Sequence, residues 1–336
     1  MAAPTFVEPI PPVLVEVWRG PLAESLHRGS VAVAEAAGSL RAALGDTSRP
    51  VFLRSLAKPI QALPVIESGA AHTYGLSARE LAAMCGSLNG EDAQAEVVAG
   101  ILGRVGLDEA SLLCGLQPPS HRPTAERLAA TGAPLSPLRH NCAGKHAAML
   151  VLCRHHGWDT SNYPDPRHPV QRLILSRLAA FCGLDEAEVA IGIDGCGVPV
   201  FGVSLEAAAR AYARLAARDE PAVERLMDAC LAHPEMIGGE GRICTAAMRA
   251  VPSCLAKTGA EGGYALALSR QGLGVVVSIE DGAMRAAHSV VVEALAQLGV
   301  LDEAGRAALA RWHRPPVKNF RGEVVGEIVP VFRLPL

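Results

Sequence analysis

The sequence predicts an α+β fold in which a mostly antiparallel sheet, built from both ends of the chain, carries helices and an inserted helical lobe. Strand-like segments gather near the two ends, whereas the pattern between Ser55 and about Cys182 is mostly helical. Two adjacent strand-like runs near residue 270 are separated by a short turn, as in an antiparallel hairpin. We therefore expect residues 1–336 to form a single catalytic unit, with a sheet lobe of about 1–54 and 185–336 and a helical lobe of about 55–184.

The composition excludes several classes of protein. Half of the 336 residues are hydrophobic and 19% are charged, so the chain can bury a large core. A net charge of −3 without a basic run argues against a nucleic-acid or anionic membrane partner. No apolar run reaches the roughly 18 residues that a membrane span requires. Prolines and acidic residues interrupt the N-terminal stretch, and the nine cysteines fit free thiols, so we expect a cytoplasmic protein.

The elements of the sheet lobe are predicted from alternating apolar runs. Residues 12–20 and 30–40 read as strands joined by a loop, and residues 188–203 read as strand that breaks at Asp194–Gly197. An Ala-rich helix should follow at 204–218. The remaining elements expected here are a helix near 243–251, strands at 263–270 and 273–280, a helix at 284–298 and a last strand at 322–334.

The helical lobe is predicted from apolar residues at helical spacing. The clearest helix covers 90–107, with acidic residues in its first turn. The Pro-rich stretch 115–141 reads as a long loop that carries a short helix.

The first chemical signal is a serine and a lysine three residues apart, Ser55 and Lys58, in an otherwise apolar run. On a helix beginning near residue 56, the two side chains would share one face. Apolar surroundings lower the pKa of a lysine, which then becomes able to take a proton from serine. The alternative is a helix N-cap with a lysine that reaches out to solvent.

Two further motifs add to this pair. Ser87-Leu88-Asn89 precedes a predicted helix, and Lys257-Thr258-Gly259 stands at the predicted entrance to a strand. Ser-x-x-Lys, Ser-x-Asn and Lys-Thr-Gly, in this order, are the signatures of penicillin-recognising serine acyl transferases. A second serine and lysine could orient the first pair or relay protons. Each motif alone is also typical of an ordinary turn.

A second group of residues suggests a metal site. Cys142, Lys145 and His146 lie within about one helical turn, and Cys196 follows a strand in a Gly-rich turn. Two thiolates and one nitrogen ligand, with one position open, would suit zinc. By spacing, His146 is the more ordinary nitrogen ligand, and the alternative is that the cysteines are simply buried.

The remaining polar candidates are weaker. Asp194 could orient or balance the charge of a lysine, although Asp-Gly is also a common turn pair. His155, His156 and His168 are expected on the surface or in loops, and no role is assigned to them.

Five stretches of the sequence together resemble one family. They are RSLAKPIQALP, HNCAGKHAAML, DGCGVPVFG, HPEMIGGEGR and AKTGAEGG. They are similar to the L-asparaginases of the Rhizobium etli type, also called class 3 or thermolabile asparaginases. The resemblance extends from the first strand to near the C-terminus. It implies hydrolysis of L-asparagine to L-aspartate and ammonia, a fold similar to serine β-lactamases and penicillin-binding enzymes, and a homodimer.

The resemblance also implies roles for individual residues. Two Ser–Lys tandems would be Ser55 with Lys58 and Ser87 with Lys257. One Zn²⁺ per chain would be held by Cys142, Lys145 and Cys196, and Arg54 and Asp194 would support the substrate. Lys145 thus replaces His146 as the expected nitrogen ligand.

The chain departs from this family beside the second serine. The family commonly reads Cys-Ala-Ser-His-Ser-Gly-Glu, whereas residues 85–91 here place Leu88 for the histidine and Asn89 for the following serine. Either change could alter substrate choice.

We accordingly expect an amidohydrolase that acts on a small amide, most simply an asparaginase. The alternatives are a glutaminase or other amidase of this fold, a penicillin-binding enzyme, and a non-catalytic zinc or amino-acid binding protein. The spacing of the residues does not decide which serine attacks.

Overall fold

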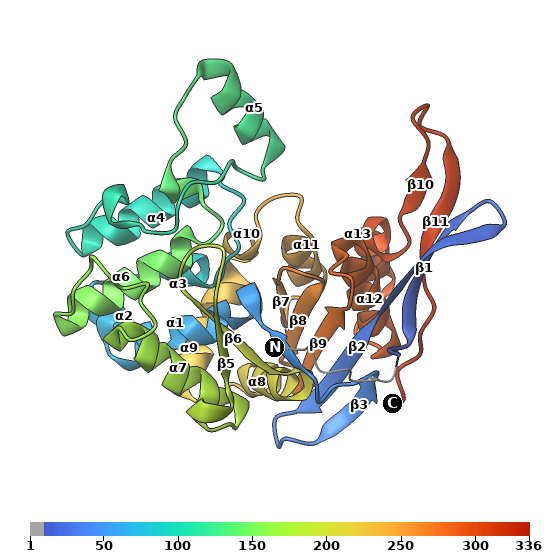
Figure 1. The fold of residues 1–336 in the computed structure, drawn as a ribbon, viewed down its shortest axis with the longest axis horizontal. Helices are drawn as coiled ribbons and strands as arrows, with labels where there is room; N and C mark the ends of the chain where they lie inside the picture. The colour runs from blue at the N-terminus through green and yellow to red at the C-terminus, as the bar shows by residue number, and fades with distance from the viewer. Residues whose placement is uncertain (1–9) are drawn as a thin grey trace, which may run out of the picture.

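The computed structural model describes residues 10–336. Figure 1 shows most of the helices, among them α1 to α7, on one side of the molecule and a long twisted sheet on the other, with α11, α12 and α13 beside the sheet. The strands of the main sheet are β1 (Val13–Arg19), β2 (Leu22–Glu35), β3 (Leu40–Leu44), β7 (Cys254–Thr258), β8 (Gly263–Leu268), β9 (Leu273–Ile279), β10 (Pro316–Lys318) and β11 (Val324–Pro330). Their order is β10-β11-β1-β2-β9-β8-β7, with β3 also paired to β2. Every pairing in this sheet is antiparallel, so the expected α+β architecture is confirmed.

A second, small sheet has the order β4-β6-β5. Its strands are β4 (Pro50–Phe52), β5 (Ala190–Ile193) and β6 (Pro199–Ser204). The turn between β5 and β6 carries Asp194 and Cys196, at the break that the sequence predicts.

The helices follow the expected order in the chain. They are α1 (Lys58–Glu67), α2 (Ala70–Thr73), α3 (Ala78–Cys85), α4 (Asp92–Arg104), α5 (Arg122–Thr131), α6 (Ala143–His156), α7 (Pro169–Cys182), α8 (Leu205–Ala217), α9 (Pro221–Ala232), α10 (Pro234–Ile237), α11 (Ile243–Ala250), α12 (Met284–Gln297) and α13 (Glu303–His313). Short 3₁₀ turns are η1 (Arg54–Ala57), η2 (Glu109–Ser111), η3 (Pro137–Arg139) and η4 (Glu186–Glu188). Among residues 10–336, no helix has both the length and the apolar character that crossing a membrane requires.

Burial explains how the layers are held together. Residues 31–34 of β2 are all fully buried, although their side chains alternate between the two faces of the sheet. Both faces are therefore covered at this point. α8 packs on β2, β8 and β9, while α12 packs on β1, β8, β9 and β11.

On the helical side, α1 is the central helix. Its first eight residues are all buried, and it contacts α3, α6, α7 and α9. A helix that is apolar on all sides must be enclosed by its neighbours. Lys58 begins this helix and is therefore inside the protein.

Three sequence predictions need correction. The strand expected at 30–40 begins at Leu22 and ends at Glu35, and only two residues separate it from β1. Its first half contains charged residues because that part of the sheet is largely exposed, which gave it the appearance of a loop. Lys257 lies within β7 and not at the entrance to a strand. The helices α9 and α13 were not predicted.

Glycine at position 144 permits the close contact of α6 with α3. A Cβ atom at this position would lie 2.0 Å from the backbone oxygen of Ala83. We predict that Gly144→Ala lowers the free energy of unfolding by about 3 kcal/mol, because backbone atoms cannot move aside cheaply. Denaturant unfolding followed by circular dichroism measures this change.

The matched control is Gly103→Ala in α4, where a Cβ atom would meet nothing within 4 Å. Alanine there should raise stability by about 0.5–1 kcal/mol, since glycine disfavours a helix interior. Equal effects of the two substitutions would contradict the packing argument.

Candidate active site

The central feature of the site is a serine that lies between two buried lysines. Ser87 Oγ accepts a hydrogen bond from Lys257 Nζ at 2.7 Å and another from Lys58 Nζ at 3.3 Å. Both lysines are 0% exposed, and Ser87 is 7% exposed. A hydroxyl held by two desolvated amines can pass a proton to either one and so become a nucleophile or a relay.

These three residues come from three different elements. Lys58 begins α1, Ser87 follows the end of α3, and Lys257 lies on β7, an edge strand of the main sheet. Gly86 lets the chain pass close to α10 after α3 ends, because a Cβ atom there would lie 2.1 Å from Met236 O. The backbone N–H of Ser87 donates to Ile237 O at 2.9 Å, which fixes the position of the serine.

Backbone carbonyls hold the two amines in place. Lys58 Nζ donates to Gly86 O at 2.9 Å and to Asn141 O at 3.0 Å. Lys257 Nζ donates to Thr258 O at 2.9 Å. For Lys58, the acceptors Gly86 O, Asn141 O and Ser87 Oγ use all three N–H groups of the charged amine.

Burial weakens the hold of both lysines on their protons. Desolvation lowers the pKa of Lys58, and the positive charge of Lys145 lowers it further. Desolvation and the charge of Lys58 lower the pKa of Lys257 to about 7. Because the charge of Lys58 disfavours a charge on Lys257, the Lys257 amine can act as a base near neutral pH.

Ser55 lies close by in sequence and accepts a hydrogen bond from the backbone N–H of Lys58 through its backbone oxygen. Within residues 10–336, the acceptors of Lys58 Nζ are Gly86 O, Ser87 Oγ and Asn141 O, and the Ser55 hydroxyl is not among them. Ser55 belongs to η1, is partly exposed, and precedes Lys58 by one turn. Arg54 just before it has φ = 49°, in the left-handed region that non-glycine residues rarely adopt. Such strain costs about 1 kcal/mol or more and is common at functional sites.

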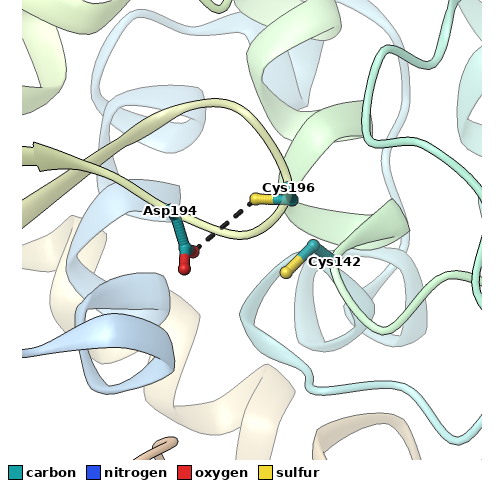
Figure 2. Close-up of side chains that lie close together, drawn as sticks. All are labelled: Cys142, Asp194 and Cys196. Atoms are coloured by element: carbon teal, nitrogen blue, oxygen red, sulfur yellow. Dashed lines mark hydrogen bonds between the residues drawn. The ribbon is translucent and has the colours of Figure 1, made fainter.

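A second cluster lies beside the first. The ligand atoms of Cys142, Asp194 and Cys196 all lie within 4.8 Å of one another. Figure 2 shows the three side chains converging, two from the β5–β6 turn and one from the start of α6. The Cys196 thiol is 3.6 Å from Asp194 Oδ2, the contact marked by the dashed line.

Asp194 joins this cluster to the serine site through two ion pairs. Its Oδ2 accepts from Lys145 Nζ at 3.1 Å, and its Oδ1 accepts from Arg54 Nε at 2.8 Å. Burial alone would raise the pKa of Asp194, but the charges of Lys145 and Arg54 outweigh it and hold the pKa below its ordinary value. The carboxylate therefore anchors the residue that precedes Ser55.

The donor chemistry of this cluster fits a zinc ion. A hydrogen bond from Cys196 lowers the pKa of Cys142 well below its ordinary value, helped by the charges of Lys58 and Lys145. Burial would lower the pKa of Lys145, but the sulfurs of Cys142 and Cys196 and the Asp194 carboxylate raise it. Two sulfurs with a nearby amine or carboxylate form a donor set that zinc accepts, provided that the amine loses its proton.

His146 is directed elsewhere. Its Nδ1 lies 2.6 Å from Tyr163 Oη, and burial lowers the pKa of the ring to about 3. Of the two nitrogen donors considered from the sequence, Lys145 is the one that contacts the cluster. His168 accepts from the backbone N–H of Val170 at the start of α7, a structural contact.

Sequence reasoning missed the backbone acceptors of the site, Gly86 and Asn141. The only signals for them were their positions, directly before Ser87 and directly before Cys142. The two residues that depart from the resembled family, Leu88 and Asn89, are each 2% exposed. Burial alone does not separate them from the site, since Lys58 and Lys257 are fully buried as well.

Comparison with known proteins shows the family to which the chain belongs. A family model described as L-asparaginase II matches residues 15–330. The match covers nearly the whole chain and makes the protein an amidohydrolase. It belongs to the L-asparaginase II family. None of the curated proteins compared with the chain matches it.

Several solved structures are distantly similar. A β-lactamase from Mycobacterium bovis is 15% identical, with 85% of this chain and 95% of that chain aligned and a TM-score of 0.40. A putative β-lactamase from Bacteroides dorei is 12% identical, with 79% and 92% aligned and a TM-score of 0.41. A Bacillus glutaminase is 11% identical, with 81% and 91% aligned and a TM-score of 0.37.

The lowered pKa of Lys257 predicts a pH-dependent stability. Below pH 7 the folded protein must bury the lysine charge, whereas the unfolded chain keeps it at no cost up to its ordinary pKa of 10.5. The unfavourable contribution is thus complete below about pH 7 and fades as the pH rises toward 10.5. The stability of the wild type relative to Lys257→Met should therefore fall from pH 10 to pH 7 and stay level below.

Thermal unfolding across this pH range measures the difference. Lys318→Met, which removes an exposed lysine from β10, is the control. A wild-type minus Lys257→Met difference that does not change with pH would contradict a neutral buried Lys257.

The cysteine cluster predicts that metal binding depends on two of the nine cysteines, Cys142 and Cys196. We predict that the purified protein binds zinc and that Cys142→Ser and Cys196→Ser each abolish this binding, because a serine hydroxyl is a poor ligand for the ion. Cys182→Ser, in α7 and outside the cluster, should keep it. Metal content after dialysis, measured by mass spectrometry, checks the expectation, and stoichiometric zinc in both cluster variants would refute it.

Proposed function

We propose that this protein is an L-asparaginase of the Rhizobium etli type, which hydrolyses L-asparagine to L-aspartate and ammonia through a serine ester. The observation that carries the proposal is the buried contact of Ser87 with Lys58 and Lys257. Family membership supports amide hydrolysis, and the sequence resemblance supports asparagine as the amide.

In the proposed reaction, Ser55 attacks the side-chain amide carbon. Its proton passes to Lys58, and Ser87 relays a proton between Lys58 and Lys257 and onto the departing ammonia. Water then hydrolyses the ester, which frees L-aspartate and restores the serine. Ser55 is favoured for attack because it is partly exposed and follows a strained residue, although Lys58 must first release one of its three present acceptors.

A second candidate for the attacking group is Ser87 itself. It is favoured by its two direct lysine contacts, of 2.7 and 3.3 Å. In that case Lys257, with a pKa of about 7, is the better placed base.

The ion-paired residues would recognise the rest of the substrate. The Arg54 guanidinium complements an α-carboxylate, and the Asp194 carboxylate complements an α-ammonium. Cys142, Cys196 and Lys145 would hold zinc, which would act as a Lewis acid that orients the substrate. The site draws residues from both lobes, which supports a single catalytic unit. The sequence resemblance supports a cytoplasmic homodimer.

The test is ammonia release from L-asparagine and L-glutamine, side by side, by the purified protein. We predict preference for asparagine and a loss of at least about 100-fold in turnover for both Ser55→Ala and Ser87→Ala, because each removes a step of the proton path. Ser289→Ala, which removes a buried hydroxyl bonded to His313 O, should retain activity.

Mass spectrometry of rapidly quenched enzyme then locates the ester. An adduct on the peptide that contains Ser55 supports the first mechanism, and one on the peptide that contains Ser87 supports the second. Undiminished turnover in either alanine variant would remove that serine from the mechanism, and release from neither amide would overturn the proposed substrate.

A further inference from the structure

Asn89 makes an unusually complete set of hydrogen bonds two residues after Ser87. Its Nδ2 donates to Glu91 Oε1 at 2.9 Å and to Glu240 O at 3.1 Å. Its Oδ1 accepts from Ser120 Oγ at 3.2 Å. The backbone O of Asn89 accepts from His121 N at 3.1 Å, and its backbone N–H donates to Gln94 Oε1 at 2.8 Å.

These contacts tie together three segments that are far apart in sequence. They are the loop after α3, the stretch that leads into α5, and the turn between α10 and α11. Glu91 strengthens the link to the third segment, because its Oε1 also accepts from Glu240 N at 2.8 Å. The backbone of the third segment lies directly on the amide, since a Cβ atom at Gly239 would be 2.3 Å from Asn89 Nδ2.

The chemistry of the neighbours fixes the orientation of the amide. A carboxylate and a carbonyl only accept, so they must face the NH₂ group of Asn89, while Ser120 can donate to its oxygen. A serine at this position would offer one donor and could not serve Glu91 and Glu240 together. Asparagine is therefore a specific fit and not a generic polar residue.

One of the tied segments, the loop after α3, carries Ser87 itself and Gly86, whose backbone oxygen accepts from Lys58 Nζ. Ser87 N–H is bonded to Ile237 O, at the end of α10, and Leu88 N–H donates to Asn141 O at 3.1 Å. Asn141 O and Gly86 O are also the acceptors of Lys58 Nζ. Movement of the loop after α3 would therefore change the position of Ser87 and admit water beside both amines.

We propose that Asn89 is a positioning residue, which clamps these three segments and thereby keeps Ser87 and its lysines in a closed, water-poor arrangement. The inference deepens the proposed function and rests on the Ser87 site. We call Asn89 with Glu91, Glu240, Ser120 and His121 the Asn89 clamp. Its members lie outside the cysteine cluster and contact none of its residues through the bonds described.

The kinetic test is the pH profile of kcat/KM for asparagine hydrolysis. The groups that act on Lys257 are Ser87, Lys58, Cys244, Arg242 and Cys142, none of which is changed. Asn89→Ala should move the midpoint of the profile upward by at least about half a pH unit, because water stabilises the charged amine. The isosteric Asn89→Asp, which sets a carboxylate against Glu91, should have the larger effect.

The matched control is Asn319→Ala. Asn319 also makes three side-chain hydrogen bonds, but at the turn of the β10–β11 hairpin, on the far side of the molecule from α3. It should leave the midpoint unchanged. Because stability itself depends on pH, kcat/KM is expressed per folded protein, with the folded fraction measured by circular dichroism at each pH. After that correction, a shift in the Asn89 variants alone separates positioning from general stability.

Two measurements test the role of Asn89 even if the proposed substrate is wrong. If the wild type hydrolyses neither amide, the pH dependence of serine labelling by phenylmethylsulfonyl fluoride replaces the kinetic profile, and a shifted midpoint still supports the clamp. Amide hydrogen exchange should also rise in Asn89→Ala at 86–91, 119–121 and 238–241 together. Unchanged exchange in the last two segments, or superimposed pH profiles, would overturn the inference.

Discussion

Two buried lysines that share one serine hydroxyl impose the main constraint on this structure. An isolated ammonium inside a protein is costly unless polar atoms replace the water that it loses. Here the two amines donate to backbone carbonyl oxygens from three separate segments, at Gly86, Asn141 and Thr258. The loop after α3, the segment before α6 and the edge strand β7 each supply one of these acceptors. The central helix α1 supplies Lys58 itself, so the polar lining of the site is assembled from segments other than the one that carries this amine.

The architecture followed from the sequence where periodicity was regular. The break at Asp194–Gly197, the hairpin of β8 and β9 and the helix at Ser204 have clear turn and capping residues, and they lie where they were predicted. The first half of β2 did not read as a strand, because an exposed strand has polar side chains and resembles a loop. Lys257 was placed at the entrance to the strand at 263–270, which is β8, because the strand that contains it, β7, was not predicted.

The sequence indicated which residues belong to the candidate site, but it did not indicate which of them contact one another. Sequence spacing linked Ser55 to Lys58, whereas the lysine amine lies against Ser87, which is 29 residues away. Spacing also made His146 the better zinc ligand, and only the rotation of α6 decides that Lys145 contacts Asp194. Contacts between distant segments, such as those of Asn89, depend on the path of several loops. No local pattern could have signalled them.

The contact between Gly144 and Ala83 has a consequence for anyone who wishes to alter this protein. It joins the helix that bears Cys142 and Lys145 to the helix that ends before Ser87, backbone against backbone. Little space is therefore left for one half of the site to shift relative to the other at this contact. Mutant libraries that seek new amide specificities should keep residues 83 and 144 unchanged and vary the partly exposed residues around Arg54. A designer who grafts the serine site onto another scaffold would have to transplant both helices as a single piece.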